Sequence, residues 1–167
     1  NGEDKESSRE ALYTNCRTFV QDVPVGARIL IDDASIEMVV TEREGGKLKC
    51  RICNNGVIKG KKGINVPNVN ISLPALTDKD RRFIRWAIEK DIDFIAHSFV
   101  RTKDDLSEIQ QMLDDAGSHI KLISKIENQQ GIDNLDEILH HSYGVMIARG
   151  DLGVEIPTER IPIIQKE

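Results

Sequence analysis

After Pro74, short apolar runs alternate with longer stretches in which apolar residues recur every three to four positions. The short runs, at residues 93–99, 120–127 and 143–151, read as buried strands. The longer stretches predict three helices, whose apolar faces consist of Phe83, Ile84, Ala87 and Ile88, of Leu106, Ile109, Leu113 and Ala116, and of Ile132, Leu135, Ile138 and Leu139. Strands joined by helices of this length form crossovers, so the pattern predicts an α/β fold with a parallel sheet.

Local signals mark the ends of two of these helices. Thr77 followed by Asp80 resembles a capping box, and Thr102 followed by Asp105 opens the second helix in the same way. Gly117 takes the C′ position after that helix, where a left-handed residue ends it.

Before Pro74 the pattern is different. Short β-branched runs at residues 28–31, 36–41 and 48–52 are separated by turn signals at residues 32–33, 45–46 and 54–56. This spacing predicts a small antiparallel β domain with a barrel-like form. We therefore expect two domains, residues 1–70 and residues 71–167.

Composition narrows the class of protein. The 167 residues carry 23 Lys and Arg against 28 Asp and Glu, a net charge of −5, so no electrostatic case exists for nucleic acid as a partner. Nothing resembles a signal peptide or an apolar run of 18 residues, so we expect a soluble, cytoplasmic protein with no membrane partner.

The chain has three cysteines, Cys16, Cys50 and Cys53. A set that is sparse and odd in number argues against a disulfide framework. Cys50 and Cys53 have the spacing of half a zinc site, but no second pair follows. Side chains three apart in a strand point to opposite faces, so ordinary strand cysteines are the preferred interpretation.

Charged residues lie at the carboxyl ends of the last two predicted strands. In an extended chain Lys125 and Glu127 share one face, and Arg149 and Asp151 share a face of the next strand. Two carboxylates brought together repel each other unless a cation lies between them, and Mg²⁺ is commonly held by one or two carboxylates plus substrate oxygens. The spacing indicates a metal with a lysine beside it. The alternatives are a surface ion pair for Lys125 and Glu127, and an N-cap or turn role for Asp151.

Two of three further segments have both a structural and a functional interpretation, and the third has a structural interpretation alone. Residues 59–63 form a basic glycine loop, which is either a solvated turn or a phosphate contact, but its spacing is not that of a Walker loop. Ser98 and Phe99 end a predicted strand, where they either pack or line a site. His140 and His141 fall late in a helix, where they suit the carboxyl end of its dipole.

The run Ser-Lys-Ile-Glu-Asn at 124–128 and the run Ala-Arg-Gly-Asp-Leu-Gly-Val-Glu-Ile-Pro at 148–157 closely resemble the active-site signature of pyruvate kinase. Residues 60–67 and 96–101 resemble further segments of that family, in its order. The resemblance covers most of the chain. It implies a partial TIM (β/α)8 barrel of about three βα units, preceded by a small antiparallel β-barrel lid domain. Because a closed barrel needs about eight strands, the chain resembles a fragment that is inactive in isolation.

The resemblance also implies roles for individual residues. Lys125 is the catalytic lysine that neutralises the phosphoryl group in flight, and Glu127 and Asp151 ligate Mg²⁺ or Mn²⁺. The substrate-binding residues are Lys125 and Asp151 together with Ser98, Phe99, Ala148, Arg149 and Gly150. Lys62, with Lys61 as the alternative, meets the nucleotide. Asp32 and Asp33 resemble the Asp-Asp-Gly turn of the lid, from which Ala34 departs.

The implied reaction converts phosphoenolpyruvate and ADP into pyruvate and ATP. The resemblance further implies a homotetrameric parent that uses K⁺, with the K⁺ ligands outside this chain. Two rival functions remain open. One is a Mg²⁺-dependent aldolase that forms a pyruvate enolate on a related barrel. The other is a non-catalytic β-barrel module that binds oligonucleotides, against which stands the single aromatic, Phe19, between residues 18 and 70.

Overall fold

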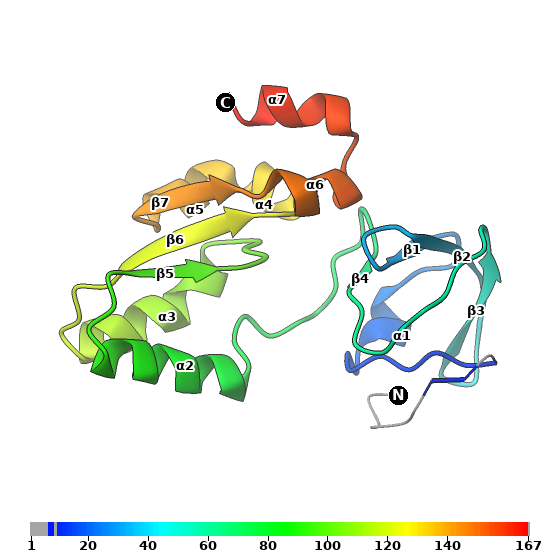
Figure 1. The fold of residues 1–167 in the computed structure, drawn as a ribbon, viewed down its shortest axis with the longest axis horizontal. Helices are drawn as coiled ribbons and strands as arrows, with labels where there is room; N and C mark the ends of the chain where they lie inside the picture. The colour runs from blue at the N-terminus through cyan, green and yellow to red at the C-terminus, as the bar shows by residue number, and fades with distance from the viewer. Residues whose placement is uncertain (1–6, 9, 167) are drawn as a thin grey trace. The chain divides into compact units, whose positions relative to one another are not determined.

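The structure is a computed structural model that describes residues 7, 8 and 10–166. The chain forms two compact units, Asn1–Leu73 and Pro74–Glu167. Each unit contains its own sheet (Figure 1).

The first unit is built on an antiparallel sheet of four strands in the order β3-β2-β1-β4. Its elements are α1 (Phe19–Asp22), β1 (Arg28–Ile31), β2 (Ile36–Glu44), β3 (Lys47–Ile52) and β4 (Ile64–Asn65). The three strands predicted here are confirmed, whereas the two-residue β4 has no signal in the sequence. The sheet is open within the described residues, because β3 and β4 are its edges, so a closed barrel is not formed.

Side chains alternate between the two faces of the strands, and those on the buried face form the core of this unit. Ile36, Met38 and Val40 of β2 point inward, while the outward positions of its second half are polar and exposed. These side chains pack with Ile29, Ile31, Val23 and Val66. A core of this kind is what period-two patterning predicts for a sheet with one buried face.

The turn between β1 and β2 is left-handed at three successive residues. Asp32, Asp33 and Ala34 have φ values of 55°, 53° and 65°. Ala34 therefore adopts the conformation that a glycine would favour, despite its Cβ. For an L-residue other than glycine this conformation costs about 1–2 kcal/mol.

We expect Ala34→Gly to raise the free energy of unfolding by about 0.5–1 kcal/mol, because the relief of steric strain exceeds the added entropy of the unfolded chain. Urea unfolding of the two proteins measures this difference. Ala27→Gly in the same unit is the comparison variant, since Ala27 is not among the left-handed residues, so the substitution there removes a methyl group packed against the core and adds unfolded-chain entropy without relieving backbone strain. Equal destabilisation by both substitutions would contradict the prediction.

The second unit is built on a parallel sheet of three strands in the order β5-β6-β7. The strands are β5 (Phe94–His97), β6 (Lys121–Ile126) and β7 (Gly144–Ile147). The helical elements are α2 (Asp78–Glu89), α3 (Asp104–Asp115), α4 (Gln129–Asp133), α5 (Leu135–His140), α6 (Arg149–Glu155), η1 (Thr158–Arg160) and α7 (Ile161–Ile164). The predicted parallel α/β pattern is confirmed.

The predicted end signals of the helices are mostly confirmed. Thr77 and Asp80 form a complete capping box at the start of α2. Gly117, with φ of 59°, follows the C-cap of α3. Thr102 does not cap α3 with its side chain. Instead the Asp105 carboxylate accepts from the backbone N–H groups of Arg101 and Thr102.

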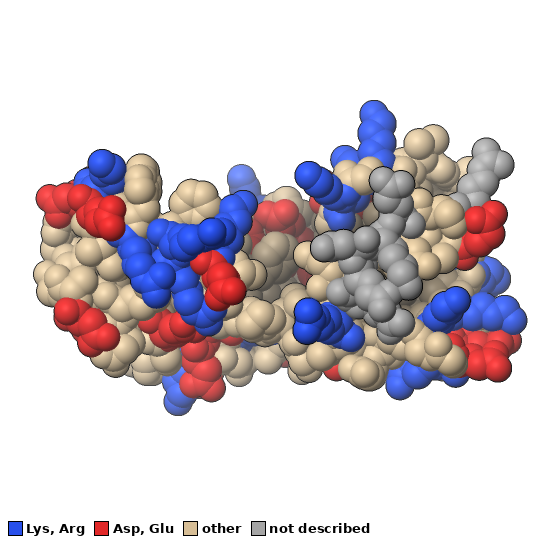
Figure 2. Space-filling view, turned by 90° about the horizontal axis from the view of Figure 1, so that it is seen from below, with Lys and Arg blue, Asp and Glu red and all other residues tan. Residues whose placement is uncertain are grey.

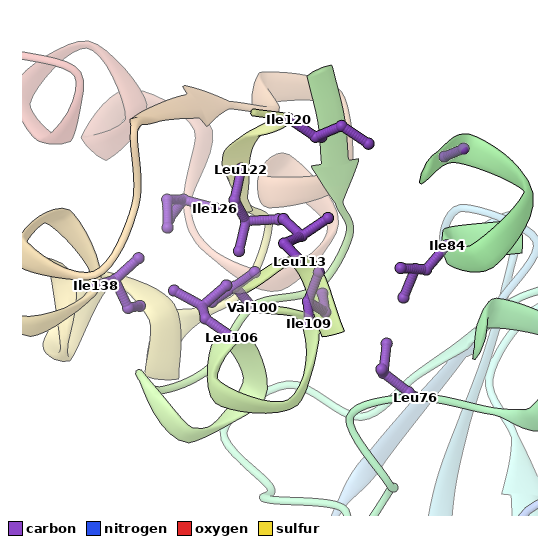
Figure 3. Close-up of a cluster of buried hydrophobic side chains, with 11 residues drawn as sticks. Leu76, Ile84, Val100, Leu106, Ile109, Leu113, Ile120, Leu122, Ile126 and Ile138 are labelled. Atoms are coloured by element: carbon purple, nitrogen blue, oxygen red, sulfur yellow. The ribbon is translucent and has the colours of Figure 1, made fainter. Parts of the chain in front are cut away.

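The core of this unit lies between the sheet and its helices. Leu106, Ile109 and Leu113 of α3 are completely buried and pack around Val100 and the strand residues of β6 (Figure 3). Burial of each such side chain stabilises the fold by about 1.5–3 kcal/mol. Three residues of the predicted apolar faces, Phe83, Ala116 and Leu139, are exposed.

Two predicted elements differ from the structure. The third helix is broken at Asn134 into α4 and α5. The last strand ends at Ile147 rather than at Asp151, and α6 begins at Arg149. Leu152 explains the second difference: it is completely buried and packs with Ile156 and Ile161, an arrangement that a helix allows and a continued strand does not.

Surface charge on the second unit is mixed. Figure 2 shows the molecule from below relative to the view of Figure 1, with Lys and Arg side chains interspersed with Asp and Glu over this unit.

Among the described residues, no helix has both the length and the apolar character needed to cross a membrane.

Candidate active site at the carboxyl ends of the parallel strands

An ion pair between Lys125 and Glu127 lies at the end of β6. Lys125 Nζ is 2.7 Å from Glu127 Oε1. The Glu127 side chain is 1% exposed and the Lys125 side chain 24% exposed, so the pair is largely removed from water. Both residues share one face of the strand, as predicted from their spacing. The alternative of an ordinary surface ion pair does not fit this burial.

The segment that follows β5 contacts this pair at three successive residues. The Lys125 ammonium donates to Ser98 Oγ at 3.1 Å. The Phe99 N–H donates to Glu127 Oε2 at 2.6 Å, and the Val100 N–H donates to the Lys125 carbonyl at 3.3 Å. Ser98 and Phe99 were predicted as possible site residues, and the structure places both against Lys125 and Glu127.

Asp151 lies at the same edge of the sheet but in a different setting from the one predicted. It is an exposed residue in the first turn of α6, so it does not line a strand face with Val145 and Ile147. Because β6 and β7 are parallel neighbours, Glu127 and Asp151 both follow the carboxyl ends of their strands. No interaction joins the two carboxylates in the described part of the chain.

Ala148, Arg149 and Gly150, which the family resemblance implies as substrate-binding residues, differ in their backbone hydrogen bonding. The Ala148 N–H donates to the Ile126 carbonyl at 3.2 Å, so it already has an acceptor. The N–H groups of Arg149 and Gly150 lie in the first turn of α6, where a helix offers no acceptor of its own. A Cβ placed on Gly150 would meet no protein atom within 4 Å, which leaves the backbone there open to approach.

Lys62 belongs to the first unit and forms an ion pair with Asp32. Its Nζ is 2.9 Å from Asp32 Oδ1, and both side chains are about one third exposed, at 35% and 33%. The hydrogen bond to Asp32 raises the pKa of the Lys62 ammonium. Lys61 is exposed and has a left-handed backbone.

Asp105 and Asn134 hold the loop after β5 through Arg101, although the sequence suggested Asp105 only as a helix-start residue and did not single out Asn134. Asp105 is almost completely buried, and its carboxylate accepts from the Arg101 N–H at 2.8 Å and from the Arg101 guanidinium at 2.7 and 3.0 Å. These hydrogen bonds outweigh the effect of burial and lower the pKa of Asp105. Asn134 donates from Nδ2 to the Arg101 carbonyl at 2.9 Å. Asn134 and Arg101 are 33 positions apart in the sequence, so no local pattern could have predicted the hydrogen bond between them.

Gly131 completes this support. A Cβ at this position would lie 2.5 Å from the Val100 carbonyl oxygen, so only glycine allows α4 to approach the loop so closely. Asn128 starts α4 by accepting from the Gly131 N–H at 2.7 Å. Asn128, the last residue of the run 124–128, is thus the N-cap of α4.

His97 ends β5 beside the loop. Burial lowers the pKa of its imidazole, against the opposing influence of the Asp105, Asp80 and Glu127 carboxylates and with the help of the Arg101 cation. The folded state therefore binds a proton at His97 less readily than the unfolded state does.

From this pKa we expect the free energy of unfolding to fall as pH decreases from 7.5 to 5.5. The unfolded imidazole, with a pKa near 6.5, takes up protons first, and the slope contributed by one group cannot exceed about 1.4 kcal/mol per pH unit. His97→Gln should flatten the slope. Urea unfolding at several pH values measures it, and an unchanged slope in the variant would contradict the assignment to His97.

Other predicted features lie away from this edge. The Nδ1 atoms of His140 and His141 are 2.6 and 2.8 Å from the Asp136 and Glu137 carbonyls at the end of α5, which confirms their helix-terminal position. The three cysteines are free thiols, and burial raises the pKa of Cys50 in β3. A broad hollow between α3 and the start of β7 lies at the amino edge of the sheet and includes none of the predicted site residues.

Comparison with known proteins shows the family of this chain. The family model described as the pyruvate kinase barrel domain matches residues 1–167. The chain belongs to the pyruvate kinase family. It is 50% identical over 155 residues to a pyruvate kinase of Borreliella burgdorferi, a match that covers 92% of this chain and 32% of that protein. It is 46% identical over 164 residues to pyruvate kinases of Staphylococcus epidermidis and Staphylococcus aureus, which covers 97% of this chain and 28% of each.

The chain thus spans about a third of the length of these pyruvate kinases. Family membership favours the kinase interpretation over the aldolase and the oligonucleotide-binding module.

Proposed function

We propose that this chain carries part of the active site of a pyruvate kinase, in which phosphoenolpyruvate and ADP give pyruvate and ATP. The observation that carries the proposal is the buried pair of Lys125 and Glu127, held at the carboxyl ends of parallel strands by Ser98 and Phe99. Barrel enzymes place their reactive groups at this end of the strands.

Glu127 and Asp151 are the residues that would hold Mg²⁺ or Mn²⁺. Both offer carboxylate oxygens, the donors that hard divalent cations prefer, and one or two protein carboxylates are enough when substrate oxygens complete the shell. The absence of a cluster of three His, Cys, Asp or Glu side chains among residues 7, 8 and 10–166 therefore does not conflict with such a site. The metal, when bound, would supply positive charge next to the substrate oxygens.

The chain's own groups would then perform the positioning that phosphoryl transfer requires. The Lys125 ammonium, already held by Glu127 and Ser98, offsets negative charge that develops on the moving phosphoryl group. The N–H groups of Arg149 and Gly150 orient the substrate carboxylate. Lys62 contacts the nucleotide phosphates, and its hydrogen bond to Asp32 raises the pKa of its ammonium.

The family also suggests the larger architecture. The open parallel sheet of the second unit would form three of the eight strands of a TIM barrel, since within residues 7, 8 and 10–166 the outer edges of β5 and β7 have no strand partner, and a closed barrel pairs such edges. The first unit would act as a lid that brings Lys62 to the nucleotide. K⁺, a homotetrameric assembly and a cytoplasmic location belong to the same proposal.

Calorimetric titration of the intact protein with Mn²⁺ tests the metal site. We expect Glu127→Gln and Asp151→Asn each to weaken binding at least tenfold, because loss of one of two carboxylates removes a large share of the local charge. Glu137→Gln, on the exposed face of α5, is the matched control. Unchanged Mn²⁺ affinity in both site variants would reject the assignment.

A further inference from the structure

Phe99 has a left-handed backbone, with φ of 54°. This conformation is uncommon for any residue with a Cβ, and for a bulky one it marks strain. Phe99 is 48% exposed as a residue, so burial of its phenyl ring does not account for the conformation. The cause lies in the backbone.

The left-handed turn directs successive backbone groups toward β6. The Phe99 N–H reaches the Glu127 carboxylate, and the next N–H, from Val100, reaches the Lys125 carbonyl. A residue in an extended conformation would point successive N–H groups to opposite sides of the chain. Two adjacent N–H groups therefore meet one strand end only because the chain turns at Phe99.

Residues of α3 and α4 and the residue between α4 and α5 hold the loop in this turn. Asp105 binds the Arg101 backbone and guanidinium, Asn134 binds the Arg101 carbonyl, and Gly131 lies directly behind the Val100 carbonyl. Strained conformations persist where the surrounding structure overdetermines them, and they gather at functional sites.

We propose that the left-handed backbone of Phe99 is a positioning device that fixes the Glu127 carboxylate and, through it, the Lys125 ammonium. One Glu127 oxygen accepts from Phe99 and the other pairs with Lys125, so the direction of the first bond sets the direction of the second. Phe99 acts through its peptide group, and its phenyl ring is dispensable for this role. The catalytic consequence rests on the proposed function, whereas the positioning itself does not.

The test compares substitutions that differ in their tolerance of positive φ. Phe99→Gly and Phe99→Asn remove the phenyl ring but accept the left-handed region, whereas the β-branched Phe99→Val resists it. Asp91 provides the matched control, since it has φ of 56° in the same unit, follows α2 and lies at the amino edge of the sheet. Asp91→Val introduces the same strain away from Lys125 and Glu127.

Amide hydrogen exchange of residues 99 and 100 in the intact protein reads out the positioning without any assay of activity. We expect exchange at both amides to stay within about threefold of wild type in Phe99→Gly and Phe99→Asn, and to accelerate by about tenfold or more in Phe99→Val. Asp91→Val should leave both amides as in the wild type after correction for global stability. Equal exchange in the glycine and valine variants would overturn the proposal.

Steady-state kinetics add the consequence for catalysis. The value of kcat should be about 10–100-fold lower in Phe99→Val than in Phe99→Gly, because displacement of a catalytic group by about 1 Å has an effect of this size. If Phe99→Gly and Phe99→Val raised KM for phosphoenolpyruvate equally with unchanged kcat, the phenyl ring would be the functional part and the proposal would be wrong. If the wild-type protein transferred no phosphoryl group, only the proposed function would fail, and the exchange rates would still decide the positioning.

Discussion

Replacing Glu127 by alanine is expected to lower the free energy of unfolding by about 3–5 kcal/mol, because removal of one partner of a buried ion pair leaves the other without compensation. The Lys125 ammonium would lose its carboxylate at 2.7 Å, and the Phe99 N–H would lose its acceptor at 2.6 Å. Urea unfolding followed by circular dichroism measures the change.

Glu137→Ala is the matched control for this experiment. Glu137 also pairs with a lysine, but its distance to Lys103 Nζ is 3.9 Å and both side chains are exposed to solvent. Exposed pairs of this kind contribute about 0–1 kcal/mol. A cost for Glu127→Ala no larger than the cost for Glu137→Ala would show that the buried pair does not stabilise the loop after β5.

Replacing Lys125 by methionine is expected to lower kcat of the intact protein by about 10²–10³-fold while the KM for the nucleotide changes little. The ammonium would be needed chiefly where charge develops in the transition state, and methionine retains most of the side-chain volume. Lys121→Met is the matched control, because Lys121 occupies the same strand at its opposite end. Circular dichroism should verify that each variant is folded, since Glu127 loses its counter-charge in Lys125→Met.

Lys62→Met should produce the opposite kinetic pattern. Lys62 lies in the first unit, paired with Asp32 at 2.9 Å, and the proposed role is in binding the nucleotide. We therefore expect a higher KM for ADP with a smaller change in kcat, as measured by a coupled pyruvate assay. A loss of kcat alone in Lys62→Met, with a raised nucleotide KM in Lys125→Met, would reverse the assigned roles.

Local sequence patterns determined much of the second unit. The capping box at Thr77 and Asp80 and the buried stripe on α3 depend on interactions within one or two helical turns, which the sequence displays directly. The shared face of Lys125 and Glu127 follows from the period of two in a strand. The signature runs identified the family for the same reason, since their residues are close together in the sequence.

Only the tertiary structure decided which groups surround those residues. Ser98 and Phe99 contact a lysine and a glutamate 27 and 28 positions away, and Asn134 reaches Arg101 across 33 positions. Nor did periodicity reveal that residues 149–155 turn into α6, because the burial of Leu152 against α7 outweighs the local strand pattern. The left-handed backbone of Phe99 had no signal either, and at Ala34 the only signal was the glycine of the turn that residues 32–34 resemble. Both are conformations that the residues themselves disfavour, so the surrounding hydrogen bonds and packing must impose them.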